Sequence, residues 1–171
     1  LSGTGKSTLA AAVAPDLGAA PGAIHVRSDV ERKVLASVAE TERLPEQSYS
    51  RESSFAVYEA CLARAEMVLK AGHSVVLDAV FAREDERRAA QEIAARARAR
   101  FDGIWLEAPA DMLKARVSAR RGDASDATAD VVERQLAYDV GSIAWRRVDA
   151  SGPPASTLMN IRRLLNASPD G

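Results

Sequence analysis

A glycine-rich segment at the start of the chain constrains its fold more than any other feature. Residues 1–8, LSGTGKST, follow the phosphate-binding pattern G-x-x-x-x-G-K-[ST] from its second position onward. Gly3 and Gly5 allow positive φ angles, so the backbone can curl around an anion. The helix expected after them adds the positive end of its dipole. We predict a phosphate-binding loop (residues 1–8) that leads into a helix. The alternative is a glycine-containing turn that only caps the helix.

Two side chains of this loop have predicted chemical roles. Lys6 is expected to reach the β- and γ-phosphates of a nucleotide, and the Ser7 hydroxyl is expected to hold Mg²⁺. The residues expected to bind the phosphates are Ser2, Gly3, Thr4, Gly5, Lys6, Ser7 and Thr8.

The position of the loop in the sequence is unusual. A phosphate-binding loop normally follows a buried strand in a strand–loop–helix unit. Here the sequence starts within the loop. We therefore expect it to be part of a longer protein whose central strand lies outside these residues.

Composition limits the classes of function. The 171 residues carry a formal net charge of −1, which provides no global attraction for nucleic acid. Cys61 is the single cysteine, so no internal disulfide framework is possible, and it lies in an apolar helical stripe as a small hydrophobe. No signal peptide or membrane-spanning run is visible, and a cytoplasmic location is expected.

Strand-like and helical patterns alternate along the chain, which predicts an α/β fold with a parallel sheet. The expected strands are residues 23–27, 74–78, 104–106 and 145–149. The expected helices are residues 6–14, 30–39, a long helix between Ser50 and Gly72, 83–100, 111–121, a helix capped by Thr128 that runs to about Tyr138, and 157–165.

Acidic residues follow two of the expected strands. Because ligands gather at the carboxyl ends of parallel strands, Asp29 and Asp78 should lie at the same edge as the phosphate-binding loop. We assign Asp78 to the Mg²⁺ shell, through water, and Asp29 as the base for an acceptor hydroxyl. The alternatives are a helix N-cap for Asp29 and a capping or solvated acid for Asp78.

A basic helix face is the third candidate feature. Arg116 and Arg120 are one turn apart on the expected helix 111–121, and a polar loop follows at 122–127. Such a face beside a loop suits a lid that neutralises a triphosphate. A solvated arginine face is the alternative.

These motifs together resemble a group of small P-loop kinases. The resemblance rests on residues 2–8, on Arg27-Ser28-Asp29-x-x-Arg32, on Val76-Leu77-Asp78-Ala79 and on the Arg116/Arg120 pair. The group includes polynucleotide 5′-kinase-like, chloramphenicol phosphotransferase-like and zeta-toxin-like enzymes. In particular, the chain is similar to an ATP-binding domain of AAA-family ATPases, which commonly forms the C-terminal half of proteins with an aminoglycoside phosphotransferase-like N-terminal half.

The resemblance implies one domain over residues 1–171, a P-loop three-layer sandwich. It implies a sheet of order 2-3-1-4-5 with the central first strand missing, and a helical lid at about 111–139. It also implies ATP and Mg²⁺, Asp29 as the acceptor-activating residue, Lys6, Arg116 and Arg120 as catalytic residues, and Arg116 at the nucleotide. The implied function is transfer of the γ-phosphate of Mg–ATP to a hydroxyl of a small molecule or nucleic-acid end. The alternative is a nucleotide-binding regulatory module or an ATPase with little phosphotransfer.

Overall fold

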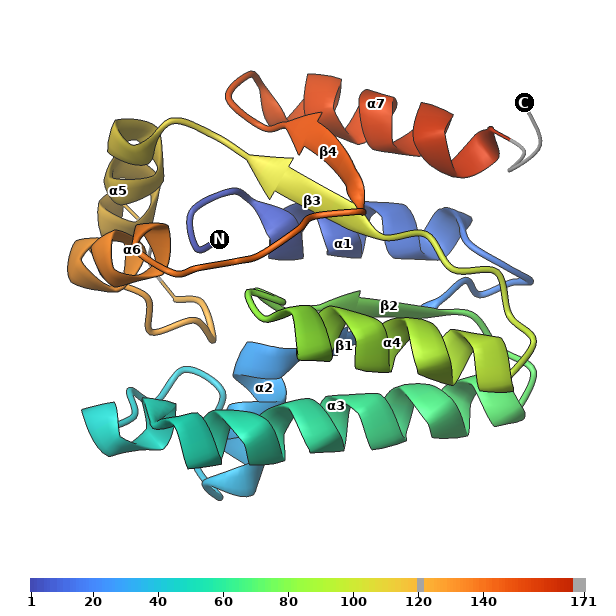
Figure 1. The fold of residues 1–171 in the computed structure, drawn as a ribbon, viewed down its shortest axis with the longest axis horizontal. Coiled ribbons are helices and arrows are strands. Elements are labelled where there is room, and N and C mark those ends of the chain that lie inside the picture. The colour runs from blue at the N-terminus through green and yellow to red at the C-terminus, as the bar shows by residue number, and fades with distance from the viewer. Residues whose placement is uncertain (120–121, 168–171) are drawn as a thin grey trace.

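The computed structural model describes residues 1–119 and 122–167. Its helices are α1 (Lys6–Val13), α2 (Ser28–Leu35), α3 (Arg51–Lys70), α4 (Glu84–Arg96), α5 (Ala110–Ala119), α6 (Ala129–Leu136) and α7 (Pro154–Asn166). Its strands are β1 (Ile24–Arg27), β2 (Val75–Asp78), β3 (Ile104–Glu107) and β4 (Arg146–Asp149). Two short 3-10 helices are η1 (Ala14–Asp16) and η2 (Glu46–Tyr49). The strands alternate with helices, as the sequence predicts (Figure 1).

The strands form two parallel pairs. β1 pairs with β2, with Arg27 opposite Asp78, and β3 pairs with β4, with Glu107 opposite Asp149. The expected α/β fold with parallel strands is confirmed. The predicted order 2-3-1-4-5 counts the missing strand as strand 1, so β1 and β2 correspond to strands 2 and 3, and β3 and β4 to strands 4 and 5. The observed pairs are neighbours in that order, and the placement of a central strand between them stays a prediction.

Helices cover the strands on two faces (Figure 1). On one face, α1 and α7 bury an apolar cluster against β4, made of Leu9, Val13, Val148 and Ile161. On the other face, α3 and α4 pack together, and Cys61 of α3 packs with Val26 of β1. Burial raises the pKa of the Cys61 thiol to about 12, so it stays protonated as a small core residue.

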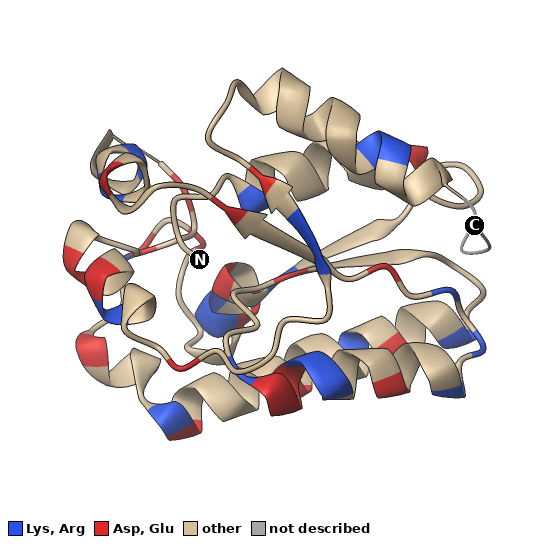
Figure 2. Ribbon diagram, turned by 45° about the horizontal axis from the view of Figure 1, so that its top comes forward, with Lys and Arg blue, Asp and Glu red and all other residues tan. Residues whose placement is uncertain are grey.

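Charged residues of both signs are interspersed over the helices (Figure 2), in keeping with the small net charge. Over the described residues, no helix combines the length and apolar character needed to cross a membrane.

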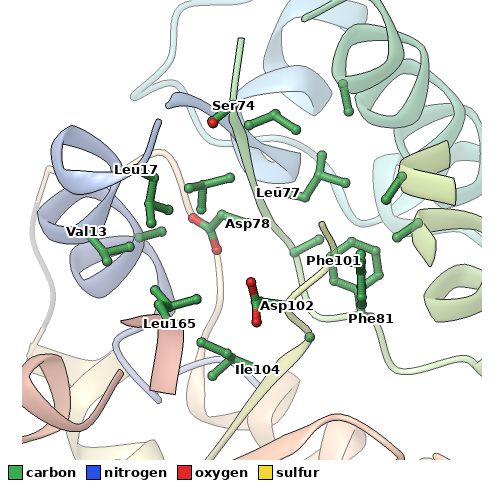
Figure 3. A pocket seen from close by; sticks show the side chains of 18 of the residues that line it. Val13, Leu17, Ser74, Leu77, Asp78, Phe81, Phe101, Asp102, Ile104 and Leu165 are labelled. Carbon is green, nitrogen blue, oxygen red and sulfur yellow. The ribbon is translucent and has the colours of Figure 1, made fainter. Parts of the chain in front are cut away.

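An apolar cavity of about 650 Å³ separates the two strand pairs. Val75–Asp78 of β2 and Ile104–Leu106 of β3 line it, and no hydrogen bond joins these strands within the described part of the chain. Figure 3 shows Val13, Leu17, Leu77, Ile104 and Leu165 around the cavity, with the carboxylate of Asp78 among them. The walls therefore combine two open strand edges with apolar helix faces.

The bounds of α2 and the end of α4 differ from the expectation, and the start of α2 matters for the site. α2 begins at Ser28, two residues earlier than expected, with Arg27 as an N-cap that makes no side-chain capping bond. It ends at Leu35 because Ser37 has a positive φ of 56°. α4 ends at Arg96, and Arg98 follows with a φ of 52°. Asp29 is consequently in the first turn of α2 and is not its cap.

A buried ion pair fastens the segment before α6 to α2. Asp126 Oδ2 lies 2.6 Å from Lys33 Nζ and 2.5 Å from the Tyr49 hydroxyl, and it also accepts from the Leu44 amide at 3.0 Å. The Lys33 side chain is only 2% exposed. Burial alone would raise the pKa of Asp126, but the hydrogen bonds from Lys33 and Tyr49 outweigh it and lower that pKa.

The cavity generates a first prediction. Fusing five β-branched apolar residues directly before Leu1 should raise Tm by at least about 5 °C, because the added strand can pair with β2 and β3 and bury its side chains. Differential scanning calorimetry measures the shift. A five-residue Gly/Ser extension is the control, and equal Tm values for the two extensions would show that the cavity does not take a strand.

The ion pair between Lys33 and Asp126 generates a second prediction. Lys33→Met should lower the free energy of unfolding at pH 7 by about 3 kcal/mol, since Asp126 loses its buried cation. The folded-state pKa of Asp126 is depressed, so its contribution is present above the ordinary value near 3.9 and is lost as pH falls through the folded value. Urea denaturation should therefore give a smaller loss at pH 3.

The matched control is Lys70→Met, which removes an exposed pair with Glu66 on α3. Its effect should stay below about 0.5 kcal/mol. A Lys33→Met loss of the same size at pH 7 and pH 3 would assign the effect to packing and contradict the role of charge.

Candidate active site

The phosphate-binding loop has the conformation that the glycine pattern predicts. Gly3 and Gly5 have φ angles of 84° and 83°. Gly5 is the N-cap of α1, and its carbonyl accepts from the Leu9 amide at 3.0 Å. The Thr4 hydroxyl donates to the Leu1 carbonyl at 2.8 Å and closes the turn. The first amides of α1 are left without intrahelical partners, as at any helix start, and can bind an anion.

The outer side of the loop is packed against α5 and α6. A Cβ at Gly3 would lie 2.6 Å from the Leu113 carbonyl oxygen, so the close approach of two backbones requires glycine there. The Ser2 amide donates to Gln135 Oε1 at 2.8 Å, and both residues are buried. The loop is therefore held by a helix pair that follows it by more than a hundred residues.

Asp78 lies beside the start of α1, as the strand order at this edge requires. The Ser7 hydroxyl is close enough to help lower the pKa of its carboxylate, and His25 Nε2 lies 3.2 Å from Oδ2. Burial would raise the pKa of Asp78, but the hydrogen bond from His25, the charge of Lys6 and the Ser7 hydroxyl together lower it. The structure thus brings Lys6, Ser7 and Asp78 together.

The environment of Asp78 fits a hydrated Mg²⁺. The side chain is 2% exposed, and its Oδ1 has no hydrogen-bond partner. An anionic oxygen in such a position is costly unless a cation or water satisfies it. Among the described residues, no group of three or more His, Cys, Asp or Glu is arranged so that it could hold a metal ion. A site made of one carboxylate and one hydroxyl suits Mg²⁺, which keeps several of its waters.

Arg27 connects this carboxylate with the segment that precedes α6. Its Nε lies 3.6 Å from Asp78 Oδ2, and its Nη2 donates to Asp123 Oδ1 at 2.6 Å. Burial would lower the pKa of Arg27, but the bond to Asp123 and the charges of Asp78 and Asp29 raise it. The Arg27 guanidinium therefore lies between Asp78 and Asp123 and is positively charged at neutral pH.

Asp29 is half-buried in the first turn of α2. Its carboxylate accepts no hydrogen bond from the described residues, so it is available to a bound molecule. The position next to the carboxyl end of β1 is the one expected from the sequence. Its predicted role as a base stays a prediction.

The two predicted lid arginines have different outcomes. Arg116 Nη1 donates to the Ala150 carbonyl at 2.8 Å, and Nη2 lies 3.4 Å from the Ser151 carbonyl. Arg116 thereby supports the loop between β4 and α7. Arg120 lies outside the described residues.

His25 and Gln135 also belong to this site, although neither was predicted to have a role there. His25 and Arg27 share one face of β1, opposite the buried Val26, and the period of two along a strand is a signal for this. Gln135 follows the buried Val132 by three residues, which places it on the buried face of α6. The identity of their partners, however, depends on tertiary structure.

Comparison with known proteins identifies the family. A family model described as an AAA domain matches residues 1–139, more than half of the chain. Uncharacterized proteins of Mycobacterium bovis and Mycobacterium tuberculosis are 35% identical over 158 residues, which is 88% of this chain. The chain spans 30% of the length of these relatives.

Solved structures support the fold. A sugar kinase from Janibacter sp. HTCC2649 matches with a TM-score of 0.68 and 20% identity, over 99% of this chain and 92% of that one. A gluconokinase from Sinorhizobium meliloti 1021 matches with a TM-score of 0.63 and 19% identity, over 96% and 89%. At this identity the likeness is one of fold. The chain therefore belongs to the AAA-domain family and has the fold of the P-loop kinases.

Proposed function

We propose that this domain binds Mg–ATP and transfers its γ-phosphate to a hydroxyl group. The observation that carries the proposal is the convergence of Lys6, Ser7 and Asp78 beside a phosphate-binding loop. Phosphoryl transfer needs a phosphate cradle, positive charge at the transferred group and a group that orients the attacking oxygen. The first two of these needs are met by residues that lie together at the start of α1.

The nucleotide side of the reaction uses residues 3–8; the amide of Ser2, which was also predicted to bind phosphate, is bonded to Gln135 instead. Backbone amides at the start of α1 would bind the β-phosphate, and Lys6 would bind the oxygens between the β- and γ-phosphates. Ser7 and Asp78 would hold Mg²⁺, Asp78 through its bare Oδ1. When bound, Mg²⁺ supplies charge neutralisation at the β- and γ-phosphate oxygens. Arg116 of α5, which supports the loop between β4 and α7, would place a positive charge near the nucleotide.

The acceptor side uses α2 and the segment 122–128. The oxygen of the acceptor hydroxyl would attack the γ-phosphorus, and Asp29 would accept the proton of that hydroxyl. The bond between the γ-phosphorus and the β–γ bridging oxygen breaks, and ADP leaves. Arg27, held between Asp78 and Asp123, lies at the same strand edge and would place a positive charge near the reacting groups. Arg120, beyond the described residues, is proposed to add further positive charge.

The proposal defines the acceptor only as a compound that carries a hydroxyl group. The fold neighbours include a gluconokinase and a sugar kinase, so sugars and sugar acids are the first acceptors to test, with aminoglycosides, nucleosides and oligonucleotide ends after them. We also propose an N-terminal aminoglycoside phosphotransferase-like domain in the parent protein as a partner of this one. Hydrolysis of ATP with no acceptor labelled would instead favour a regulatory module.

Lys6→Ala should abolish binding of Mg–ATP, because the triphosphate loses its one lysine contact in the loop. Isothermal titration calorimetry on the intact polypeptide measures the change. Lys70→Ala, an exposed lysine of α3, is the control and should bind ATP like the wild type. Unchanged affinity in Lys6→Ala would overturn the assignment of the loop.

Asp29→Asn should lower the rate of phosphoryl transfer by about 10²- to 10⁴-fold while Mg–ATP still binds, since the amide cannot take the proton. Transfer from γ-labelled ATP measures the rate. Asp130→Asn changes a comparable acid in the first turn of α6 and should leave the rate unchanged. A near-wild-type rate in Asp29→Asn would reduce Asp29 to a structural acid.

A further inference from the structure

We infer that Gln135 is a positioning residue for the phosphate-binding loop: its side-chain carbonyl holds the Ser2 amide and thereby sets the shape in which the loop meets a nucleotide. The inference rests on the proposed function, because it concerns the same site. It adds a residue that lies far from the loop in sequence and belongs to no part of the phosphate-binding pattern.

The contact is short, buried and specific. Ser2 N donates to Gln135 Oε1 at 2.8 Å, and the two residues are 4% and 8% exposed. Water has little access to either group, so the Ser2 amide would be left without a partner if the glutamine carbonyl were removed. The same bond commits the Ser2 amide to α6, so this amide is not one of those that face a phosphate.

Packing around this bond connects it with the rest of the loop. Leu1 packs against the buried cluster of Leu113, Val117 and Val132, which joins α5 to α6. Gly3 touches the backbone of Leu113. The three residues that precede Thr4 are therefore fitted to the α5–α6 pair, and the Ser2–Gln135 bond is the polar contact among them.

The helix that carries Gln135 also connects with the acceptor side. The segment just before α6 contains Asp126, which is paired with Lys33 of α2, the helix that bears Asp29. Gln135 thus lies on an element held at one end by the candidate acceptor helix and at the other by the phosphate loop. A shift of α6 would be transmitted to Ser2 through this bond.

The test compares two substitutions in the intact polypeptide. Gln135→Leu keeps the bulk of the side chain and removes the acceptor, and it should raise the Kd for Mg–ATP about 5- to 30-fold. Gln135→Glu keeps an acceptor oxygen and should give a Kd closer to that of the wild type than Gln135→Leu does. Glu133→Leu, on the same helix with a side chain 71% exposed, is the control and should leave the Kd unchanged.

A spectroscopic readout separates positioning from mere stabilisation. The amide resonances of Gly3 and Gly5 in the nucleotide-free protein should shift in Gln135→Leu and stay near their wild-type positions in Gln135→Glu. A lowered Tm in Gln135→Leu with a Kd within twofold of wild type and unshifted glycine amides would overturn the inference.

Failure of the proposed function is a distinct result. If the wild type itself binds no Mg–ATP, the kinase proposal fails before any variant is compared. The Gly3 and Gly5 resonances then still decide whether Gln135 positions the loop.

Discussion

The site depends on one close contact between backbones, that of Gly3 with Leu113. The φ of 84° already favours glycine, and a Cβ at this position would lie 2.6 Å from the Leu113 oxygen, which leaves no room for any side chain. Leu113 is itself 1% exposed and fixed within the α5–α6 cluster. The shape of the phosphate loop is therefore determined by α5 as well as by its own glycines, and a volume change inside that cluster displaces the loop.

The charge of Asp78 is a second constraint. Asp78 lies beside the start of α1, the helix that begins where the loop ends. A carboxylate with 2% exposure favours protonation, yet His25, Lys6 and Ser7 together lower its pKa. His25 bonds Oδ2, whereas Oδ1 has no hydrogen-bond partner. A buried anion with an unused oxygen costs folding free energy, and such groups concentrate at functional sites. The Mg²⁺ proposed at Asp78 would satisfy this oxygen.

Features carried by neighbouring residues could be predicted from the sequence. The phosphate loop, the alternation of strands and helices and the acid at the end of β2 each depend on a few adjacent positions. The pairing of Lys33 with Asp126 and of Ser2 with Gln135 joins segments 93 and 133 residues apart, and no local pattern specifies such partners. The early start of α2 escaped prediction because Arg27, a residue without capping preference, is its N-cap.

The two sides of the site are held by different forces, and this difference bears on specificity. The nucleotide side is fixed by close packing, at Gly3 and in the Leu113 cluster, which tolerates little change. The acceptor side is held by charges, with Arg27 on Asp123 and Lys33 on Asp126, from segments that also form the surface. Substituting one charged partner alters the position and field of that side directly and reaches the loop only indirectly, through α6. On the proposed function, this construction would allow the acceptor to differ among relatives while the nucleotide side stays the same.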